Sequence, residues 1–414
     1  MLPVLIRGGG FVNKGGEAML LTVMNELRAR IPDVTFAFAP ESVSAGNREK
    51  LKQQNIATIK PLTGSYDQLV GLGRRIAAKP WSLGKLVRSR KDWLSYDLMT
   101  VQVSAILDIR GFAYGDAWGP SKSWIGLKFT SAARRLGRPY IFLPQAWGPF
   151  STPQLRNPCK SMCENADLLY SRDSMSTQHV SSLAESLAGK VQTYPDIAFR
   201  FRQNESLNQQ EVLSRFGVPD TGRNVAIVPN MKVYERTSGT GAANLHCQQL
   251  AAACRSVIRK GYTAILLPHE IRPGRNGTID DRILCSLVAE QFDRSAAYPV
   301  LEYLNAAEAK VLISSCKATI ASRFHAIVGS LSMGIPAFVL GWSHKYKALM
   351  GDFGLEHLAI DLDSNSSVDG VDSAVCQFVD ELDGFSECIN ERLGTIKSKV
   401  DELFDTVAET VSSA

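Results

Sequence analysis

Several features that would place the chain in a special class are missing from its 414 residues. It has no run of about 18 apolar residues, so we expect no membrane-spanning helix. Its first residues, MLPVLIRGGG, lack the basic start and the cleavage site of a secretory signal, so we expect a cytoplasmic protein. Glycine (32) and proline (18) are near average, which excludes collagen-like and low-complexity character.

Metal-binding motifs and a strong charge of one sign are missing too. The eight cysteines are scattered, and the one close pair, in PCKSMC, has no second Cys or His pair nearby to complete a zinc site. We therefore expect reduced thiols and no metal. The net charge is only +5, from 46 basic and 41 acidic residues, which is too small to indicate a nucleic-acid partner.

Short apolar runs alternate with amphipathic helical patterns, which is typical of parallel sheets covered by helices on both faces. With 45% apolar residues, the chain is long enough to bury a core in each half. The expected strands are Leu2–Ile6, Val34–Ala39, Val101–Asp108, Tyr140–Leu143 and Leu168–Ser171, followed by Val225–Val228, Ala264–Leu267, Ala318–Ala321 and Ala337–Leu340.

The polar stretch Arg202–Gln210 separates the two sets of strands and marks the expected domain boundary. We predict two Rossmann-like α/β domains, residues 1–204 and 205–385, which face each other across a cleft, and a last helix within 386–414 that packs back across them. Within the second domain, Asn305 and Glu308 predict a capping box at the start of a helix.

The first strand runs into a glycine-rich loop, RGGGFVNKGGEAML. Its last part, Asn13, Lys14, Gly15, Gly16 and Glu17, opens the following helix. Glycines let backbone N–H groups approach an anion, and a helix N-terminus attracts negative charge. The spacing fits neither a dinucleotide fingerprint nor a P-loop. The loop is therefore either a binding element for an anion or acceptor, or a tight turn whose glycines serve packing.

The segment Ala321–Leu355 places cations at the ends of two consecutive expected strands. Arg323 and His325 follow the first strand, and His344 and Lys345 follow the second. An arginine can grip a carboxylate or phosphate through two parallel hydrogen bonds, and a histidine can exchange a proton near neutral pH. Because both strand ends meet at one sheet edge, we favour a functional site over isolated surface ion pairs.

Two further strand ends carry polar residues. His269 follows the strand Ala264–Leu267, and Arg172 follows Leu168–Ser171. Each either contacts a ligand or has a structural role, as a satisfied buried histidine or an ion pair at a helix start.

These motifs together resemble the polysaccharide pyruvyl transferase family. The matching segments are NKGGEAML, LPQAWGPF, SRDSMS, YPDIAF, LLPH and, most specifically, SRFHAIVGSLSMGIPAFVLGWSHKYKALM. The sequence departs from the family where Gly16 replaces a frequent aspartate. The resemblance implies a fold similar to GT-B glycosyltransferases, with the acceptor on the first domain and the donor on the second. It also implies transfer of a pyruvyl group from phosphoenolpyruvate to two hydroxyls of a sugar, and donor recognition by Arg323 and His325.

From these motifs we predict His325 as the acid and His269 or Glu17 as the base, with Arg323, Lys345, His344 and Arg172 on the donor and no cofactor. Phe112, Tyr114 and Trp118 either stack on the acceptor sugar or belong to the core. Family acceptors are often lipid-linked, so the basic stretch Arg74–Lys91 either lies against an anionic membrane or forms a solvated face. A nucleotide-sugar glycosyltransferase and a non-catalytic assembly protein remain the alternatives.

Overall fold

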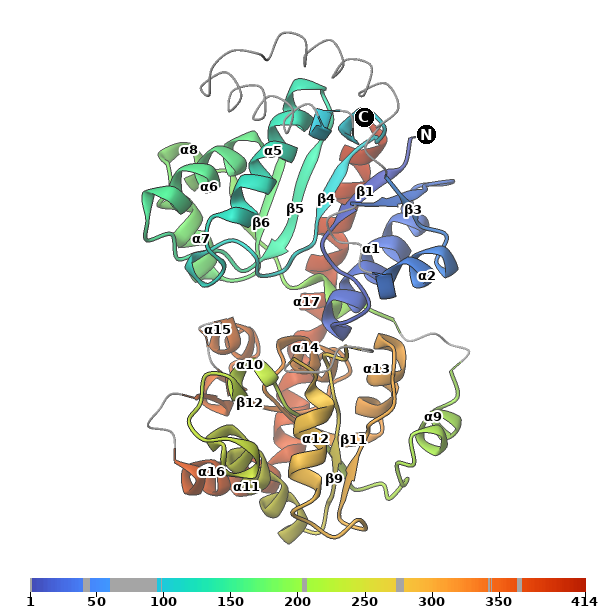
Figure 1. Ribbon diagram of the computed structural model, residues 1–414, viewed down its shortest axis with the longest axis vertical. Helices are drawn as coiled ribbons and strands as arrows, with labels where there is room; N and C mark the ends of the chain where they lie inside the picture. The colour runs from blue at the N-terminus through green and yellow to red at the C-terminus, as the bar shows by residue number, and fades with distance from the viewer. Residues whose placement is uncertain are drawn as a thin grey trace, which may run out of the picture. The chain divides into compact units, whose positions relative to one another are not determined.

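The computed structural model describes residues 2–39, 45–59, 95–97, 99–202, 207–272, 279–341, 343, 345–362 and 367–414, with the backbone alone for 45–48. The stretch Arg74–Lys91 and His344 lie outside the described residues. Contacts divide the chain into two compact units, whose elements are labelled in Figure 1. Unit 1 comprises Met1–Gly9, Val23–Tyr194 and Glu402–Ala414, and unit 2 comprises Gly10–Thr22 and Pro195–Asp401.

Unit 1 is built on a seven-stranded sheet in the order β3-β2-β1-β4-β5-β6-β7, in which every neighbouring pair is parallel. The strands are β1 (Val4–Arg7), β2 (Phe36–Phe38), β3 (Ala57–Thr58), β4 (Ile106–Asp108), β5 (Tyr140–Gln145), β6 (Leu168–Ser171) and β7 (Val191–Thr193). The helices are α2 (Ala45–Gln53), η2 (Asp116–Trp118), α5 (Ser121–Arg135), α6 (Pro153–Asn165), α7 (Ser174–Ser181) and α8 (Glu185–Ala188). Two helices, α1 (Lys14–Arg30) and α17 (Leu382–Ser412), have residues in both units.

Unit 2 carries a six-stranded sheet, also parallel throughout, in the order β10-β9-β8-β11-β12-β13. Its strands are β8 (Asn224–Val228), β9 (Thr263–Leu266), β10 (Ala297–Pro299), β11 (Cys316–Ala321), β12 (Ala337–Gly341) and β13 (Ala359–Asp361). Its helices are η3 (Ile197–Arg200), α9 (Gln209–Arg215), α10 (Met231–Tyr234), η4 (Gly241–Ala243), α11 (Leu245–Arg259), α12 (Asp281–Ala289), α13 (Ala306–Ser314), α14 (Phe324–Leu331), α15 (Lys345–Gly351), η5 (Glu356–Leu358) and α16 (Val368–Asp380).

Both sheets have the doubly wound order, which reverses once. The reversal lies between β1 and β4 in unit 1 and between β8 and β11 in unit 2. The central strands are apolar without alternation, and all six residues of β5 are buried, because helices cover both faces of such a sheet. The prediction of two parallel α/β sheets is confirmed. Ligands of doubly wound sheets bind beyond the carboxyl ends of the strands at the reversal, so we expect a functional site at one or both of these places.

One expected strand is largely wrong. Only Ile106–Asp108 of the expected strand Val101–Asp108 pairs in the sheet, and Val101 lies in a turn with 47% of its surface exposed. Apolar and polar residues alternate from Val101 to Ala105 as they would in a strand, so the sequence pattern does not mark where the turn ends.

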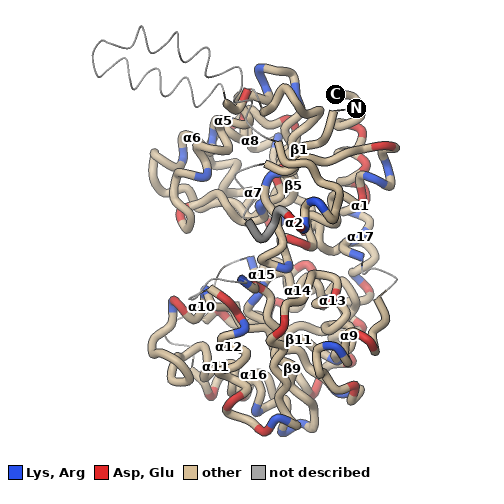
Figure 2. The backbone as a smooth tube through the Cα atoms, turned by 45° about the vertical axis from the view of Figure 1, so that its right-hand side comes forward, with Lys and Arg blue, Asp and Glu red and all other residues tan. Residues whose placement is uncertain are grey.

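Basic and acidic residues are interspersed along the chain in each unit, as the colours of the tube in Figure 2 show. This agrees with the small net charge. Among the described residues, no helix combines the length and the apolar character that crossing a bilayer requires.

Candidate active site

The candidate site of unit 2 lies where the order of its sheet reverses. The neighbouring strands β8 and β11 lead there into Asn230 and Arg323. The side-chain nitrogen of Asn230 donates to the carbonyl of Ser322 at 2.8 Å, which joins the two loops. Arg323 then occupies the N-cap position of α14, so His325 stands on the first turn of that helix.

The Arg323 guanidinium is held by two carboxylates. Its Nε and Nη2 donate to Asp281 at 2.9 and 2.5 Å, and its Nη1 donates to Glu270 at 2.8 Å. Burial works against the charged form, but the two carboxylates raise the pKa of Arg323 above its usual value. The two parallel hydrogen bonds that the sequence predicts between Arg323 and the donor substrate are therefore made to Asp281 in this structure.

Asp281, the first residue of α12, joins three segments of unit 2 and is fully buried. Besides Arg323, its carboxylate accepts backbone N–H groups from Met231 at 3.1 Å, His269 at 3.2 Å and Glu270 at 2.8 Å. The sequence pattern around this residue does not mark it as functional, because an aspartate at a helix start is ordinary capping chemistry. Its role is to fix the turn that carries His269.

The N-terminal loop pairs with that same turn. The Lys14 amide donates to the His269 carbonyl at 2.9 Å, and the Ile271 amide donates to the Val12 carbonyl at 3.0 Å, around an antiparallel bridge between Asn13 and Glu270. The segments NKGGEA and LLPHE, 250 positions apart in the sequence, are thus neighbours in unit 2.

Asn13 caps α1 and occupies the amides that the sequence offers to an anion. Its Oδ1 accepts from the backbone N–H of Gly15 at 2.9 Å and of Gly16 at 3.3 Å. This is the side-chain capping expected at a helix N-terminus. An anion could use these amides only if the Asn13 side chain turned away.

Lys14 is buried and all three of its N–H groups have partners. Its Nζ donates to the Phe11 carbonyl at 2.8 Å, to Glu17 Oε2 at 3.0 Å and to the Tyr303 hydroxyl at 3.1 Å. Burial lowers the pKa of Lys14, and the Glu17 carboxylate offsets part of that shift. Lys14 and Glu17 therefore form a buried ion pair that anchors the start of α1.

His325 faces this loop. A Cβ atom on Gly15 would lie 2.1 Å from the His325 Nδ1, so only glycine leaves room for the imidazole. On the other side of the ring, Nε2 lies 3.5 Å from Oδ2 of the buried Asp196. The imidazole is 18% exposed, so it can still reach a ligand. Asp196 comes from the YPDIAF segment, one of the motifs that resemble the family.

His269 is buried beside several positive groups. Burial, followed by the charges of His325, Arg323 and Lys14, lowers the pKa of His269 well below its usual value. It is therefore neutral near pH 7 and a weak proton acceptor. Together with Lys14, Gly15, Lys310 and His325 it lines a cavity of about 20 Å³. That volume holds about one water molecule, so a larger ligand needs some of the lining residues to move.

The remaining predicted donor residues fall in two places. Lys345 begins α15, and its Nζ lies 5.7 Å from the ring centre of Phe324, the residue between Arg323 and His325. Arg172 belongs to unit 1, where it is buried at the end of β6 and its backbone N–H donates to the Gln145 carbonyl at 3.0 Å.

Unit 1 has a buried polar network at its own point of reversal. Arg7 of β1 donates to Asp108 of β4 at 3.2 Å, and the hydroxyls of Tyr114 and Tyr140 donate to the same carboxylate oxygen at 2.6 and 2.9 Å. Tyr114 has no exposed surface and stacks on Trp147 with ring centres 5.2 Å apart. Tyr114 therefore belongs to the core and does not present its ring to an acceptor sugar.

The chain that carries these motifs matches the model of a known protein family. The model described as polysaccharide pyruvyl transferase matches residues 13–344, from the N-terminal loop to the end of β12. The chain belongs to this family. The family match thus includes Asn13, Asp196, His269 and His325, the residues that unit 2 brings together.

One relative of this pyruvyl transferase family member is distant in sequence. The amylovoran biosynthesis protein AmsJ of Erwinia amylovora is 21% identical over 290 residues, which is 69% of this chain and 67% of AmsJ. Two solved structures share the fold at 12% identity over the full length of both chains. They are the UDP-GlcNAc 2-epimerase of Neisseria meningitidis bound to UDP-GlcNAc (TM-score 0.60) and HepE of Anabaena in complex with UDP and glucose (TM-score 0.54). The predicted GT-B-like fold is thereby confirmed.

Proposed function

We propose that this chain transfers the pyruvyl group of phosphoenolpyruvate to two hydroxyls of a sugar, in a polysaccharide or its lipid-linked precursor, and forms a ketal. The observation that carries the proposal is the placement of His325 within a family match that spans 13–344. Its imidazole is partly exposed, stands 3.5 Å from a buried carboxylate and faces the family's N-terminal loop. A cytoplasmic site of action is part of this proposal.

His325 is the proposed acid. Its imidazole can deliver a proton to the methylene carbon of phosphoenolpyruvate, and the Asp196 carboxylate, 3.5 Å away, can hold the ring in position. The adjacent carbon becomes electrophilic, and one sugar hydroxyl attacks it and loses its proton. The bond between that carbon and the phosphate oxygen then breaks, and the second hydroxyl closes the ketal while its proton returns to His325. The phosphate leaves with the carbon–oxygen bonding electrons, so the products are the ketal and inorganic phosphate.

Cations at the same sheet edge are the proposed donor ligands. A guanidinium has five N–H groups, and the three that hold Asp281 and Glu270 leave one on each Nη of Arg323 for the donor. Lys345 is the proposed second cation of unit 2, with His344 beside it in the sequence. The loop from Asn13 to Glu17 lies in the same unit and belongs to the proposed set, whereas Arg172 lies in unit 1 and stays a prediction from the sequence.

His269 is proposed as a neutral hydrogen-bonding group in the site. Its lowered pKa makes His269 a poor base. Glu17 is ion-paired with Lys14, so neither residue is well suited to remove a hydroxyl proton. The departing phosphate is itself basic enough to take that proton. The role of His269 is then to orient the donor rather than to titrate.

Donor choice separates this proposal from a nucleotide-sugar glycosyltransferase. At about 100 times its Kd, a ligand stabilises the folded protein by about 2.7 kcal/mol, which corresponds to a rise in Tm of roughly 5–10 °C. We expect that rise with phosphoenolpyruvate and none with UDP- or GDP-sugars, together with phosphate release when lipid-linked or free sugars are added. Stabilisation by nucleotide sugars alone would favour the glycosyltransferase, and stabilisation without phosphate release from any acceptor would favour an assembly protein.

Gly15→Ala is expected to lower kcat at least tenfold, because the new methyl group takes the space of the His325 ring. The helix itself tolerates alanine better than glycine by about 1 kcal/mol, so any loss of stability comes from the contact with His325 and not from the helix. The matched control is Gly394→Ala in α17, where a Cβ meets nothing within 4 Å. Full activity of Gly15→Ala in a phosphate-release assay would contradict the placement of His325.

A further inference from the structure

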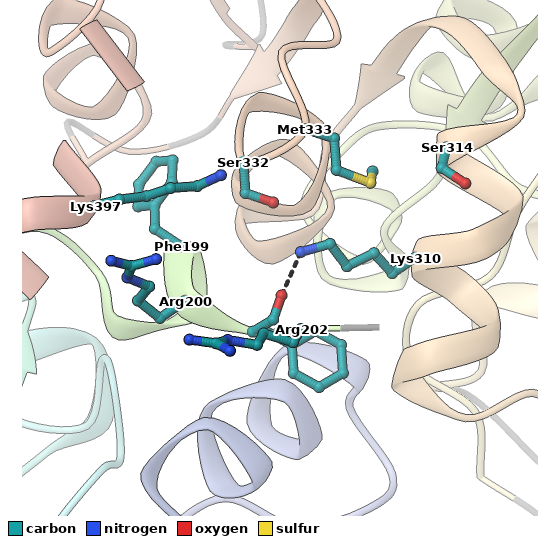
Figure 3. Close-up of a pocket in the computed structure, with 9 residues that line it drawn as sticks. Phe199, Arg200, Arg202, Lys310, Ser314, Ser332, Met333 and Lys397 are labelled. Atoms are coloured by element: carbon teal, nitrogen blue, oxygen red, sulfur yellow. Dashed lines mark hydrogen bonds between the residues drawn. The ribbon is translucent and has the colours of Figure 1, made fainter. Parts of the chain in front are cut away.

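A second cavity of unit 2, of about 340 Å³, is lined by four basic side chains (Figure 3). We call it the Lys310 pocket. Its polar lining consists of Arg200, Arg202, Lys310, Ser314, Ser332 and Lys397. These residues come from η3 and the segment after it, from α13, from the end of α14 and from α17. Among the described residues, no aspartate or glutamate lines it.

Lys310 is the most buried of these cations, with 8% of its surface exposed. Its Nζ donates to the carbonyl of Phe201, drawn as a dashed line in Figure 3, and it makes no ion pair with any described carboxylate. Burial, and then the neighbouring charge of Lys397, lowers the pKa of Lys310 to about 8. At neutral pH the fold therefore holds a buried positive charge that it does not neutralise.

Lys397, on the opposite wall of the pocket, is a second cation without a described ion-pair partner. It projects from α17 into the pocket, near Ser332 in Figure 3, and has no ion-pair partner in the described part of the chain. Burial and the charge of Arg200 lower the pKa of Lys397. The nearby acid, Asp401, is paired with Arg200 and does not line the pocket. Two ammonium groups thus converge without a counter-charge.

The two serine hydroxyls of the pocket are neutral and already donate hydrogen bonds within the chain. Ser314 and Ser332 donate to carbonyls of their own helices, Val311 and Gly329, each at 2.7 Å. The N–H donors available to a ligand are therefore cationic ones. Keeping like charges together in a partly buried pocket is unfavourable unless an anion joins them.

We propose that the Lys310 pocket binds the phosphate group of a small phosphorylated ligand. A phosphate matches convergent ammonium and guanidinium groups, and the volume falls within the range of small-molecule pockets, which leaves room for a sugar attached to it. Lys310 and Phe201 also line the small cavity at His325, so the bound phosphate would lie next to the proposed active site. The inference rests on this pocket alone and holds whichever group the enzyme transfers.

Isothermal titration with inorganic phosphate and with a hexose 1-phosphate tests the proposal. We expect Lys397→Gln to weaken binding of both probes about tenfold or more, because it removes one charge-assisted contact. The matched control, Lys399→Gln, makes the same charge change on an exposed residue of the same helix and should leave the affinity within about twofold. Lys310→Met should weaken binding further, but Lys397→Gln decides the outcome if that variant does not fold.

His325→Gln separates this pocket from the proposed active site. We expect it to keep wild-type affinity for both probes, since His325 does not line the Lys310 pocket. Loss of phosphate binding in His325→Gln, or wild-type affinity in Lys397→Gln, would overturn the proposal. If the hexose 1-phosphate binds at least tenfold more tightly than phosphate, the ligand is a phosphorylated sugar. Equal affinities identify the free phosphate ion as the ligand.

Discussion

Replacing His325 with glutamine is expected to lower kcat for phosphate release from phosphoenolpyruvate by about 10²- to 10⁴-fold, the usual contribution of a positioned acid. Glutamine retains much of the shape of the imidazole and can still donate a hydrogen bond, but it cannot deliver a proton to carbon. The KM for phosphoenolpyruvate should change little, because the proposed cationic ligands remain in place. Steady-state rates with a sugar acceptor measure both quantities.

The pH profile separates an acid from a residue that only shapes the site. If the site uses a side-chain acid at this position, the wild-type profile of kcat against pH should contain a limb that the residual rate of His325→Gln lacks. His357→Gln is the matched control, because His357 is an exposed histidine of unit 2 at η5. A His325→Gln enzyme that kept kcat within about threefold of wild type would refute the assignment.

The sheet architecture was predictable because its central strands are short apolar runs that alternate with amphipathic helices. β6 lies at Leu168–Ser171, as predicted, and the capping box is confirmed, with the Glu308 amide donating to Asn305 at 2.9 Å. The edge strands were not predictable. Both residues of β3 are exposed, and β7 buries one of its three, so neither has an apolar pattern to recognise.

The site could be predicted only where its residues are close in sequence. Arg323 and His325 lie at one strand end, and a two-residue spacing is enough to see them together. The partners that define their roles are remote. Asp281 is 42 positions from Arg323, and its carboxylate turns a predicted donor ligand into part of a buried ion cluster. No local periodicity encodes that contact, because it is created by the sheet order that brings β8, β9 and β11 together.

Asp281→Asn is expected to lower the free energy of unfolding by about 3–5 kcal/mol, the usual cost of leaving one partner of a buried ion pair alone. Arg323 and the backbone N–H groups of Met231 and Glu270 all donate to the two oxygens of Asp281. Asparagine has one oxygen and one NH2 group, so at least one of these donors would face another donor and lose its acceptor. Chemical denaturation, followed by far-UV circular dichroism, measures the loss in the transition of unit 2.

The matched control is Asp361→Asn, an acid of the same unit that is 48% exposed and pairs with Lys347 on the surface. Because water screens that pair, its removal should cost far less than the change at Asp281. Equal denaturation midpoints for Asp281→Asn and wild type would mean that the cluster does not hold the His269 turn. If the cluster does hold the turn, Asp281→Asn should also expose two amides to hydrogen exchange: that of Glu270, which lies in the turn, and that of Lys14, which donates to the His269 carbonyl of the turn.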